Sequence, residues 1–330
     1  MDTKNKDKKK SRSRKVTVDK IKCKKKSKSK TNKNDRKIKN PKTLEIKTLH
    51  TAAFKQTIER IAGYISECVI CFVQPDDDID ADDDYFDEGN DNSEKKHKTQ
   101  GNEKNKGGIT IIKLTEDHNV YIKLRLYASH FDEFYCSQKT KEIGVDMSYF
   151  NNMLKFINDD MALVLYMTEN NPGVLFISTS DQGETSKEQT DVQLTLIELP
   201  PQEPILDKVE FENKICIESS KFNNICKKLY TTANSITICS TRNKITFTGE
   251  GDPGSATISH EDSRIKSGHS GYDKIISGKY DIKNLLGFSK CNKICDYLDI
   301  YFLDNYPLVL ILPVSGLGKL YVFISPLDEK

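Results

Sequence analysis

The feature that most constrains the fold is a helix-then-strand pattern that occurs four times along the chain. Four stretches carry apolar residues at the spacing of a buried helix face, and each is followed by a short run of β-forming residues. Two of these stretches share the hexamer F-N-N-x-x-K, at Phe150–Lys155 and at Phe222–Lys227. The other two begin near Phe54 and Ile282. A supersecondary unit used four times predicts a repeat architecture with two units in each of two similar domains.

Most of the remaining patterned sequence predicts β-strands. Short β-branched or alternating runs bounded by turn residues are typical of strands in antiparallel sheets. The predicted strands are 68–73, 109–114, 120–126, 163–167, 174–177, 192–199, 214–217, 236–239, 245–248, 256–259, 298–303, 308–312 and 320–324. The predicted fold class is therefore α+β, with two helices packed on antiparallel sheets in each domain.

Charge is distributed unevenly along the chain. Residues 1–42 hold 20 Lys and Arg against four acidic residues, which leaves 31 basic and 45 acidic residues for the remainder. A segment with so little apolar surface cannot offset the entropy lost on ordering, so we expect a disordered basic tail. Its lysine blocks are typical of a nuclear-import signal or of an arm that holds DNA.

Two further segments interrupt the pattern. An aspartate run from Asp76 to Asp84 opens a polar stretch with patterned sequence on both sides, which predicts a disordered acidic insert. The proline-rich segment Leu199–Pro204 predicts an extended connector. The predicted organisation is a tail (1–43), an N-terminal domain (44–199, with the insert at 74–106), a connector (200–210) and a C-terminal domain (211–330).

Composition argues against a membrane or secreted protein. No apolar run approaches the roughly 18–20 residues that span a bilayer, and the N-terminus lacks the apolar segment of a secretory signal. Nine cysteines, an odd number without tight spacing, indicate reduced thiols rather than a disulfide framework. We therefore expect a soluble intracellular protein that binds no membrane.

Signals for metal or enzyme chemistry are weak. Cys68 and Cys71 have C-x-x-C spacing but no second pair or histidine cluster, which favours free thiols over zinc. The run from Asp76 imitates a calcium loop, but Ala81 replaces the glycine and Asp87 the terminal glutamate. With no nucleophile or phosphate-loop signature, we expect no enzymatic activity and no cofactor. A metal-dependent nucleic-acid enzyme that uses the acidic run is the alternative from another class.

Several dispersed segments have the order and spacing of a known family. They are Phe134–Cys136, Ile143–Met147, Leu194–Leu199, Phe222–Leu229, Ile245–Gly251, Pro307–Val309 and Leu320–Pro326. In this order they resemble the DNA polymerase sliding clamps of the proliferating cell nuclear antigen family, over nearly all of 44–330 apart from the acidic insert. The resemblance implies the DNA clamp fold, in which three two-domain subunits close a pseudo-sixfold ring around duplex DNA, with helices lining the hole and sheets outside.

The resemblance also implies a function and a set of partners. A clamp is a processivity factor that tethers DNA polymerase and other replication and repair proteins, and its partners include a clamp loader and proteins with clamp-binding peptide motifs. The expected localisation is the nucleus, or the cytoplasmic replication site of a large DNA virus. A subunit of a heterotrimeric checkpoint-type clamp shares the fold and is the alternative to a homotrimer.

Family positions that face the hole map to lysines and one arginine on the four helices. A clamp should contact phosphates weakly and without base readout, because tight binding would stop it sliding. Gln56, Ala62, Asn152 and Asn224 stand where the family usually has Lys or Arg, so we expect a less positive hole and a compensating basic tail. The expected DNA-facing residues are Lys55, Arg60, Lys155, Lys227, Lys228, Lys283 and Lys290.

The resemblance implies two protein-binding surfaces. Subunits join through the edge strands Thr190–Leu199 and Ser255–Glu261, and the second strand looks shortened because 260–274 departs from the family pattern. A partner peptide with an aromatic-tipped helical turn docks in an aliphatic groove beneath the connector. The expected groove residues are Leu114, His118, Ile205, Leu206, Pro307, Leu308, Phe323, Ile324, Ser325 and Pro326.

Overall fold

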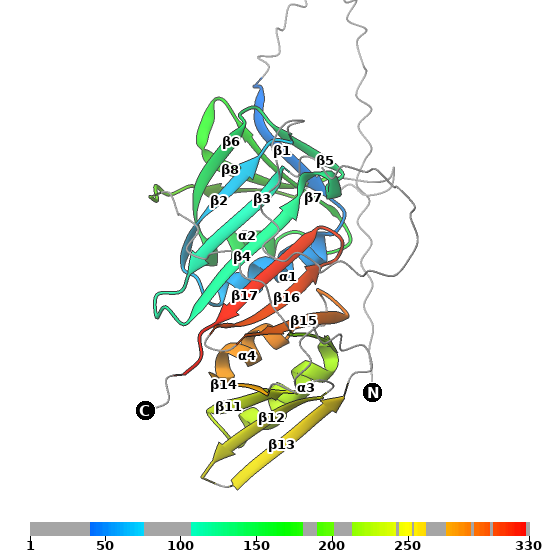
Figure 1. Cartoon of the computed structure of the whole chain (residues 1–330). Helices are drawn as coiled ribbons and strands as arrows, with labels where there is room; N and C mark the ends of the chain where they lie inside the picture. Colours follow the sequence, from blue (N-terminus) through cyan, green and yellow to red (C-terminus); the bar gives the residue numbers. More distant parts are fainter. Residues whose placement is uncertain are drawn as a thin grey trace, which may run out of the picture. The chain divides into compact units, whose positions relative to one another are not determined.

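Each of the four predicted helix-and-strand units is a strand, a helix and a returning strand. They are seen in a computed structural model, which describes residues 40–75, 107–180, 190–200, 213–241, 244–252, 254–261, 275–291, 294–303 and 306–327 (Figure 1). The units are β1 (Lys42–Thr48), α1 (Thr51–Ala62) and β2 (Glu67–Val73); β6 (Thr140–Asp146), α2 (Met147–Leu154) and β7 (Ala162–Thr168); β10 (Asn213–Glu218), α3 (Ser219–Tyr230) and β11 (Ser235–Ser240); and β14 (Ile276–Asp281), α4 (Ile282–Ser289) and β15 (Tyr297–Phe302).

The other strands extend these units into three sheets. They are β3 (Gly108–Leu114), β4 (Val120–Tyr127), β5 (Glu133–Cys136), β8 (Asn171–Ser180), β9 (Asp191–Thr195), β12 (Lys244–Gly251), β13 (Gly254–Glu261), β16 (Leu308–Val314) and β17 (Gly318–Ile324), with a 3-10 turn at Ala128–His130. The strand orders are β5-β1-β7-β8-β9, β10-β15-β16-β17-β4-β3-β2-β6 and β13-β12-β11-β14. All the pairings within them are antiparallel, which confirms the α+β fold class.

The eight-stranded sheet joins the two halves of the chain, which we define as the first half (40–200) and the second half (213–327). Strand β17 of the second half pairs with β4 of the first half along seven residue pairs, from Gly318 opposite Leu126 to Ile324 opposite Val120. We call this pairing the internal junction. Because it makes the sheet continuous, residues 40–327 belong to one compact unit.

The sequence period of each helix explains which face it buries. The fourth residue of every helix is a large apolar side chain with at most 3% exposure, namely Phe54, Phe150, Phe222 and Leu285. The second helix of each half also begins in the same way, because the carboxylate of its N-cap aspartate accepts a backbone hydrogen bond: Asp146 from Tyr149 and Asp281 from Lys283. The two halves thus repeat both the buried pattern and the local cap.

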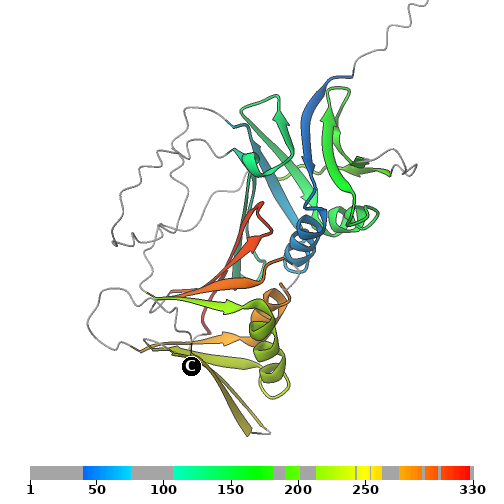
Figure 2. The same cartoon turned by 90° about the vertical axis from the view of Figure 1, so that its right-hand side faces the viewer.

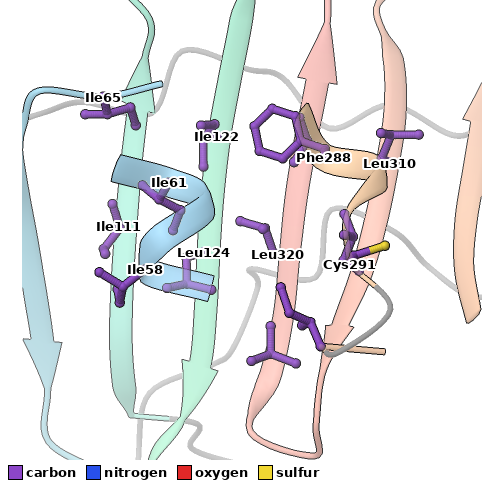
Figure 3. Close-up of a cluster of buried hydrophobic side chains, with 14 of the residues drawn as sticks. Ile58, Ile61, Ile65, Ile111, Ile122, Leu124, Phe288, Cys291, Leu310 and Leu320 are labelled. Atoms are coloured by element: carbon purple, nitrogen blue, oxygen red, sulfur yellow. The ribbon is translucent and has the colours of Figure 1, made fainter. Parts of the chain in front are cut away.

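All four helices lie in a row on one side of the sheets, in the order α2, α1, α4 and α3 (Figure 2). Ile58 and Ile61 of α1 lie over Ile111 and Leu124 of the sheet, and Phe288 of α4 lies near the strands of the second half (Figure 3). These side chains belong to one large cluster of buried residues, which we call the inner core.

Helices α1 and α4 meet beside the internal junction. The ring of Tyr64, which follows α1, stacks on that of Phe288 with 4.3 Å between the ring centroids. The Tyr64 hydroxyl donates to the carbonyl oxygens of Asn284, at 3.2 Å, and Lys283, at 3.4 Å. Burial raises the pKa of Tyr64 to about 12. The two halves are therefore joined through both the sheet and the helices.

The structure corrects several sequence predictions. Strands β1, β5, β6 and β14 were not predicted, and β13 is not shortened, because all eight of its residues pair with β12. The predicted strand 192–199 ends as a ladder at Thr195, and Ile197 makes a separate bridge to Gly144. Nearly all of the predicted tail, insert and connector lies outside the described residues.

Candidate nucleic-acid interface and partner groove

The predicted DNA-facing lysines recur at matched helix positions. Counted from the first residue of each helix, the ninth residue is Lys155 after α2, Lys227 in α3 and Lys290 after α4, and all three side chains are exposed. Helix α1 departs from this pattern, because its ninth residue is the exposed Glu59. Three of the four helices thus present a cation at the same place on the helix row.

Lys55 on α1 is tied to its own chain. Its ammonium group pairs with the Asp159 carboxylate and donates to the backbone carbonyl of Ile157, both in the loop that follows α2. The Lys55 side chain retains only 17% exposure. The Asp159 side chain is 56% exposed, so solvent screens this ion pair, but the Ile157 carbonyl gives Lys55 a second acceptor, and the two contacts join α1 to this loop.

Arg60 lies at the end of α1 that faces the second half. Its guanidinium is 3.7 Å from the carboxylate of the neighbouring Glu59, and its Nε is buried without a hydrogen-bond partner. The hydrogen bond with Cys295 is the largest cause that lowers the pKa of the Cys291 thiol, and the charge of Arg60 adds to it; at Tyr64 the charge of Arg60 partly offsets the burial that raises the pKa. Arg60 is thus part of the contact between α1 and α4.

The cations on the helices of the second half are exposed to solvent. Lys227 and Lys228 are both exposed in the last turn of α3, where a cation also interacts favourably with the helix dipole. Lys283 is exposed in the first turn of α4. Lys221, also exposed on α3, was not among the predicted residues, although its place one turn before Asn224 and two turns before Lys228 could have indicated it. Its pair with Glu218, at 3.3 Å, is exposed on both sides and therefore weak.

Aromatic side chains occupy part of the same row in the first half. Tyr149 on α2 is 62% exposed and Phe156, just after it, is 60% exposed. The two residues are seven apart and so lie on one face of the turn that continues α2. The sequence analysis did not single them out.

Two residues of the predicted groove, Leu114 and Phe323, lie on the face of the eight-stranded sheet that is opposite the helices. A second group of buried apolar side chains gathers there, distinct from the inner core, and we call it the outer apolar cluster. Leu114, Tyr121, Phe323 and Val309 lie opposite one another across β3, β4, β17 and β16. The outer apolar cluster is Tyr121, Tyr301, Val309, Ile311, Tyr321 and Phe323, with Ile112, Leu114 and Tyr306 packed against it.

Several predicted groove residues surround this cluster. His118 is exposed at a left-handed backbone position (φ 57°) in the turn between β3 and β4, and Asn119 of that turn accepts a hydrogen bond from Ser325 at 2.9 Å. Pro326, next to Ser325, is exposed, and Pro307 is half-buried beside Tyr306. The structure thus brings the turn after β3 together with the end of β17. Ile205 and Leu206 lie outside the described residues.

Leu308 and Ile324 are corrections to the predicted groove. Both side chains are fully buried in the inner core, on the helix side of the sheet. Successive residues of a strand point to opposite faces, so Ile324 cannot share a face with Phe323, nor Leu308 with Val309. The missed members Tyr121, Tyr301 and Tyr321 could have been found by the same alternation.

Metal binding finds no support in the part of the chain that the structure describes. No group of three or more His, Cys, Asp or Glu side chains there could hold a metal ion. The eight cysteines within these ranges are free. Burial raises the pKa of Cys68 to about 12, and its thiol donates to the Met147 sulfur at 3.2 Å. The candidate calcium loop lies outside the described ranges.

Over the described ranges, no helix is long and apolar enough to cross a membrane.

Two strands that were predicted to join subunits are the outermost of their sheets. Strand β9 ends the sheet of the first half and lies against α2, while β13 ends the four-stranded sheet of the second half. Val192 and Leu196 in and after β9, and Ala256 and Ile258 in β13, are only partly buried although they pack against the inner core. Both strands therefore leave apolar side chains incompletely covered in the single chain.

Two similar halves, each with two helices on antiparallel sheets and joined through a shared sheet, define the class of DNA clamps. A crystal structure of proliferating cellular nuclear antigen from Entamoeba histolytica matches this fold with a TM-score of 0.69, at 17% identity over 87% of this chain and all of that one. The family models for the N-terminal and C-terminal domains of proliferating cell nuclear antigen match residues 98–202 and 205–327. The chain belongs to the proliferating cell nuclear antigen family.

Relatives with curated names agree with this assignment. A protein of Acanthamoeba polyphaga mimivirus named "Probable DNA polymerase sliding clamp" is 41% identical over 302 residues, which are 90% of this chain and 65% of that protein. This chain thus spans just under two thirds of that relative's length. Proliferating cell nuclear antigen 2 of Drosophila melanogaster is 24% identical over 66% of this chain and 84% of its own length.

Proposed function

We propose that the protein is a non-enzymatic sliding clamp, which encircles duplex DNA as a ring of three identical subunits and tethers DNA polymerase to it. The observation that carries this proposal is the internal junction. There β17 and β4 pair antiparallel along seven residue pairs, and α4 and α1 meet beside them. The same kind of junction can be made between copies.

The internal repeat identifies the strands that would make it. Strand β17 is the last strand of the second half, and β9 holds the same place in the first half; β4 follows β3 in the first half as β13 follows β12 in the second. Pairing of β9 with β13 of another copy would therefore repeat the internal junction. Such a contact is head-to-tail and closes into a ring when the rotation per copy permits. Three copies of two halves give the pseudo-sixfold ring that the family resemblance implies.

The helix row supports the DNA side of the proposal. With the sheets outside, the exposed cations of the row would face the hole and neutralise phosphates without reading bases. The candidates are Lys55, Arg60, Lys155, Lys227, Lys228, Lys283 and Lys290, with Lys221 added by the structure.

The outer apolar cluster supports partner binding on the outside of the ring. Leu114 and Tyr306 at its margin are only partly buried, and His118 and Pro326 nearby are exposed. An aliphatic and aromatic cluster with partly buried side chains at its margin suits a short peptide with an aromatic-tipped helical turn. The proposed occupants are peptide motifs of DNA polymerase, the clamp loader and other replication and repair proteins. The site of action would be the nucleus or the cytoplasmic replication site of a large DNA virus.

A topological binding assay tests the function. The full chain is mixed with a linear duplex biotinylated at both ends, and streptavidin is added either after or before the protein. A ring threads over open ends and is then trapped, so we expect protein retained through a high-salt wash only when streptavidin is added last. Equal retention in both orders, or none in either, would contradict a clamp that encircles DNA.

A further inference from the structure

The helix row differs in charge between its two halves. In the helices and their flanking turns, the first half (50–66 and 146–161) holds three basic and four acidic residues. The corresponding described segments of the second half (218–234, 281–291 and 294–296) hold five basic and three acidic residues. The same structural unit is thus slightly acidic in one half and basic in the other.

Matched positions show where the difference arises. The ninth and tenth residues, counted from the start of each helix, are Glu59–Arg60 for α1, Lys155–Phe156 for α2, Lys227–Lys228 for α3 and Lys290–Cys291 for α4. Their formal charge is zero at α1, one at α2, two at α3 and one at α4. The second half therefore presents three of the four net charges at this level of the row.

Contacts within the chain further increase the difference in available positive charge between the two halves. Lys55 is paired with Asp159 and holds the Ile157 carbonyl, and Arg60 lies beside Glu59 at the contact with α4. Lys55 is thus engaged within the chain, and Arg60 has the carboxylate of Glu59 beside it at 3.7 Å. By contrast, Lys227 and Lys228 are exposed on a helix that contains no acidic residue.

We propose that the phosphate-contacting surface of this clamp is the α3–α4 face of the second half, with Lys221, Lys227 and Lys228 as its main contacts. The inference rests on the proposed function, since it assumes that the helix row faces duplex DNA. A ring built from such subunits would hold DNA at three positions, one for each α3 helix, rather than six. Lys55 is in this view a residue that positions the loop after α2.

The test compares charge-matched variants of the full chain by the salt dependence of binding to a linear duplex. The second-half variant is Lys227→Gln with Lys228→Gln, and the first-half variant is Lys55→Gln with Lys155→Gln. A control on the other face of the second half is Lys244→Gln with Lys279→Gln, whose sequence neighbours Ile245 and Tyr280 point into the inner core. All three lose the same formal charge, so long-range effects of net charge cancel.

We expect the second-half variant to reduce the slope of log affinity against log salt by about 1–2 for each subunit that contacts the DNA. The variant removes two lysines from each subunit, and each phosphate contact contributes about 0.9 to the slope. The first-half and control variants should change the slope by less than half of that amount. Light scattering and thermal melting establish that each variant is folded and assembled. If the Lys55→Gln change prevents folding, Lys155→Gln and Lys227→Gln, both at the ninth position, replace the double variants.

The other results overturn the inference. Equal loss from the two helix variants would mean six-position contact, and the trapping of protein on end-blocked DNA would then still support the clamp function. A larger loss from the first half would reverse the assignment. No change from either helix variant, together with failure of the trapping assay, would remove the helix row from the DNA surface and contradict the proposed function as well.

Discussion

The internal junction and the outer strands β9 and β13 are built from equivalent parts, but only the internal junction is buried. On β4 and β17, Leu124 and Leu320 lie opposite each other with no exposed surface. On β9 and β13, Val192 and Ile258 at the sheet ends are only partly buried. Because the sequence places apolar residues at both sites, the partly buried side chains of the outer strands support the proposal that β9 and β13 pair between copies.

The same difference bears on the proposed ring. An outer strand with apolar inward residues is an aggregation hazard unless it is covered. Closure of the proposed ring would cover β9 and β13, whereas β4 and β17 already cover each other in the internal junction. The internal junction between β4 and β17 is permanent, whereas a junction between β9 and β13 would form only on assembly.

The largest effect should come from a charge placed on the inward face of β13. Ile258→Glu would bury a carboxylate against the neighbouring subunit, at a cost of about 3 kcal/mol or more per interface. We expect light scattering to report a single subunit at concentrations where the parent protein is a ring, and thermal melting to fall as well, because Ile258 also packs against the inner core of its own chain. Thr257→Glu, on the exposed opposite face of the same strand, is the matched control.

The second prediction concerns close backbone contact in the internal junction and in the segment that follows β9. A Cβ at Gly318 would lie 2.0 Å from the Arg125 carbonyl oxygen in the internal junction, and one at Gly144 would lie 2.2 Å from the Ile197 carbonyl oxygen beside β9. We expect Gly318→Ala to lower the free energy of unfolding by roughly 2–3 kcal/mol, since the strands must separate. Gly144→Ala should displace the segment after β9 and weaken assembly as well.

Chemical denaturation measures the first effect and light scattering the second. Gly173→Ala is the control, because a Cβ there meets nothing within 4 Å. If Gly318→Ala and Gly173→Ala were equally stable, the close packing of the internal junction would be refuted.

The helix side of the internal junction should respond to alkaline pH. The pKa of Tyr64 is raised to about 12 in the folded chain, above its ordinary value of 10.0. Its contribution is therefore complete below pH 10 and is lost as the pH rises from 10 to 12, by up to roughly 2–3 kcal/mol.

Tyr64→Phe separates this effect from general alkaline unfolding. It loses the hydrogen bonds to Asn284 and Lys283, worth about 1 kcal/mol at neutral pH, and should flatten the decline of stability between pH 10 and 12. Denaturant titrations at several pH values measure both. A variant that declines as steeply as the parent would argue against Tyr64 as the titrating group. Tyr280, whose pKa burial also raises to about 12, is unchanged in this variant.

The smallest effect is expected at the partner groove. Leu114→Ala removes a partly buried side chain at the margin of the outer apolar cluster and should weaken a synthetic clamp-binding peptide by about 1–2 kcal/mol, with little loss of stability. Ile324→Ala, in the inner core on β17, should instead destabilise the fold by about 2–4 kcal/mol. Isothermal titration and thermal melting distinguish the two. If Leu114→Ala left the affinity for the peptide unchanged, the groove would have to lie elsewhere.

The sequence predicted the four helices and most of the apolar strands, but it missed β1 and β6, with seven residues each, as well as the shorter β5 and β14. The four helices and strands such as β4 and β17 have clear periods, whereas β5 has four residues and β14 contains a glycine among polar residues. The order of segments was enough to predict the family. The tie between Lys55 and Asp159 could not be predicted, because it joins residues 104 positions apart through a loop whose path is fixed only by folding.

Alternation within strands was the signal that the sequence analysis used least. It separates Leu308 and Ile324 from the groove and adds Tyr121, Tyr301 and Tyr321 to it. The exposure of the lysines on α3 was predictable from the helix period. That α3 presents more exposed charge than α1 could be seen only from the contacts of Lys55 and Arg60 in the structure.

Static light scattering on the purified full chain across micromolar concentrations tests the central claim most directly. If β9 of each copy pairs with β13 of the next, the measured mass should be about three times the 37.6 kDa of one chain, and should stay there on dilution. A mass of one chain at every concentration would contradict assembly through these strands.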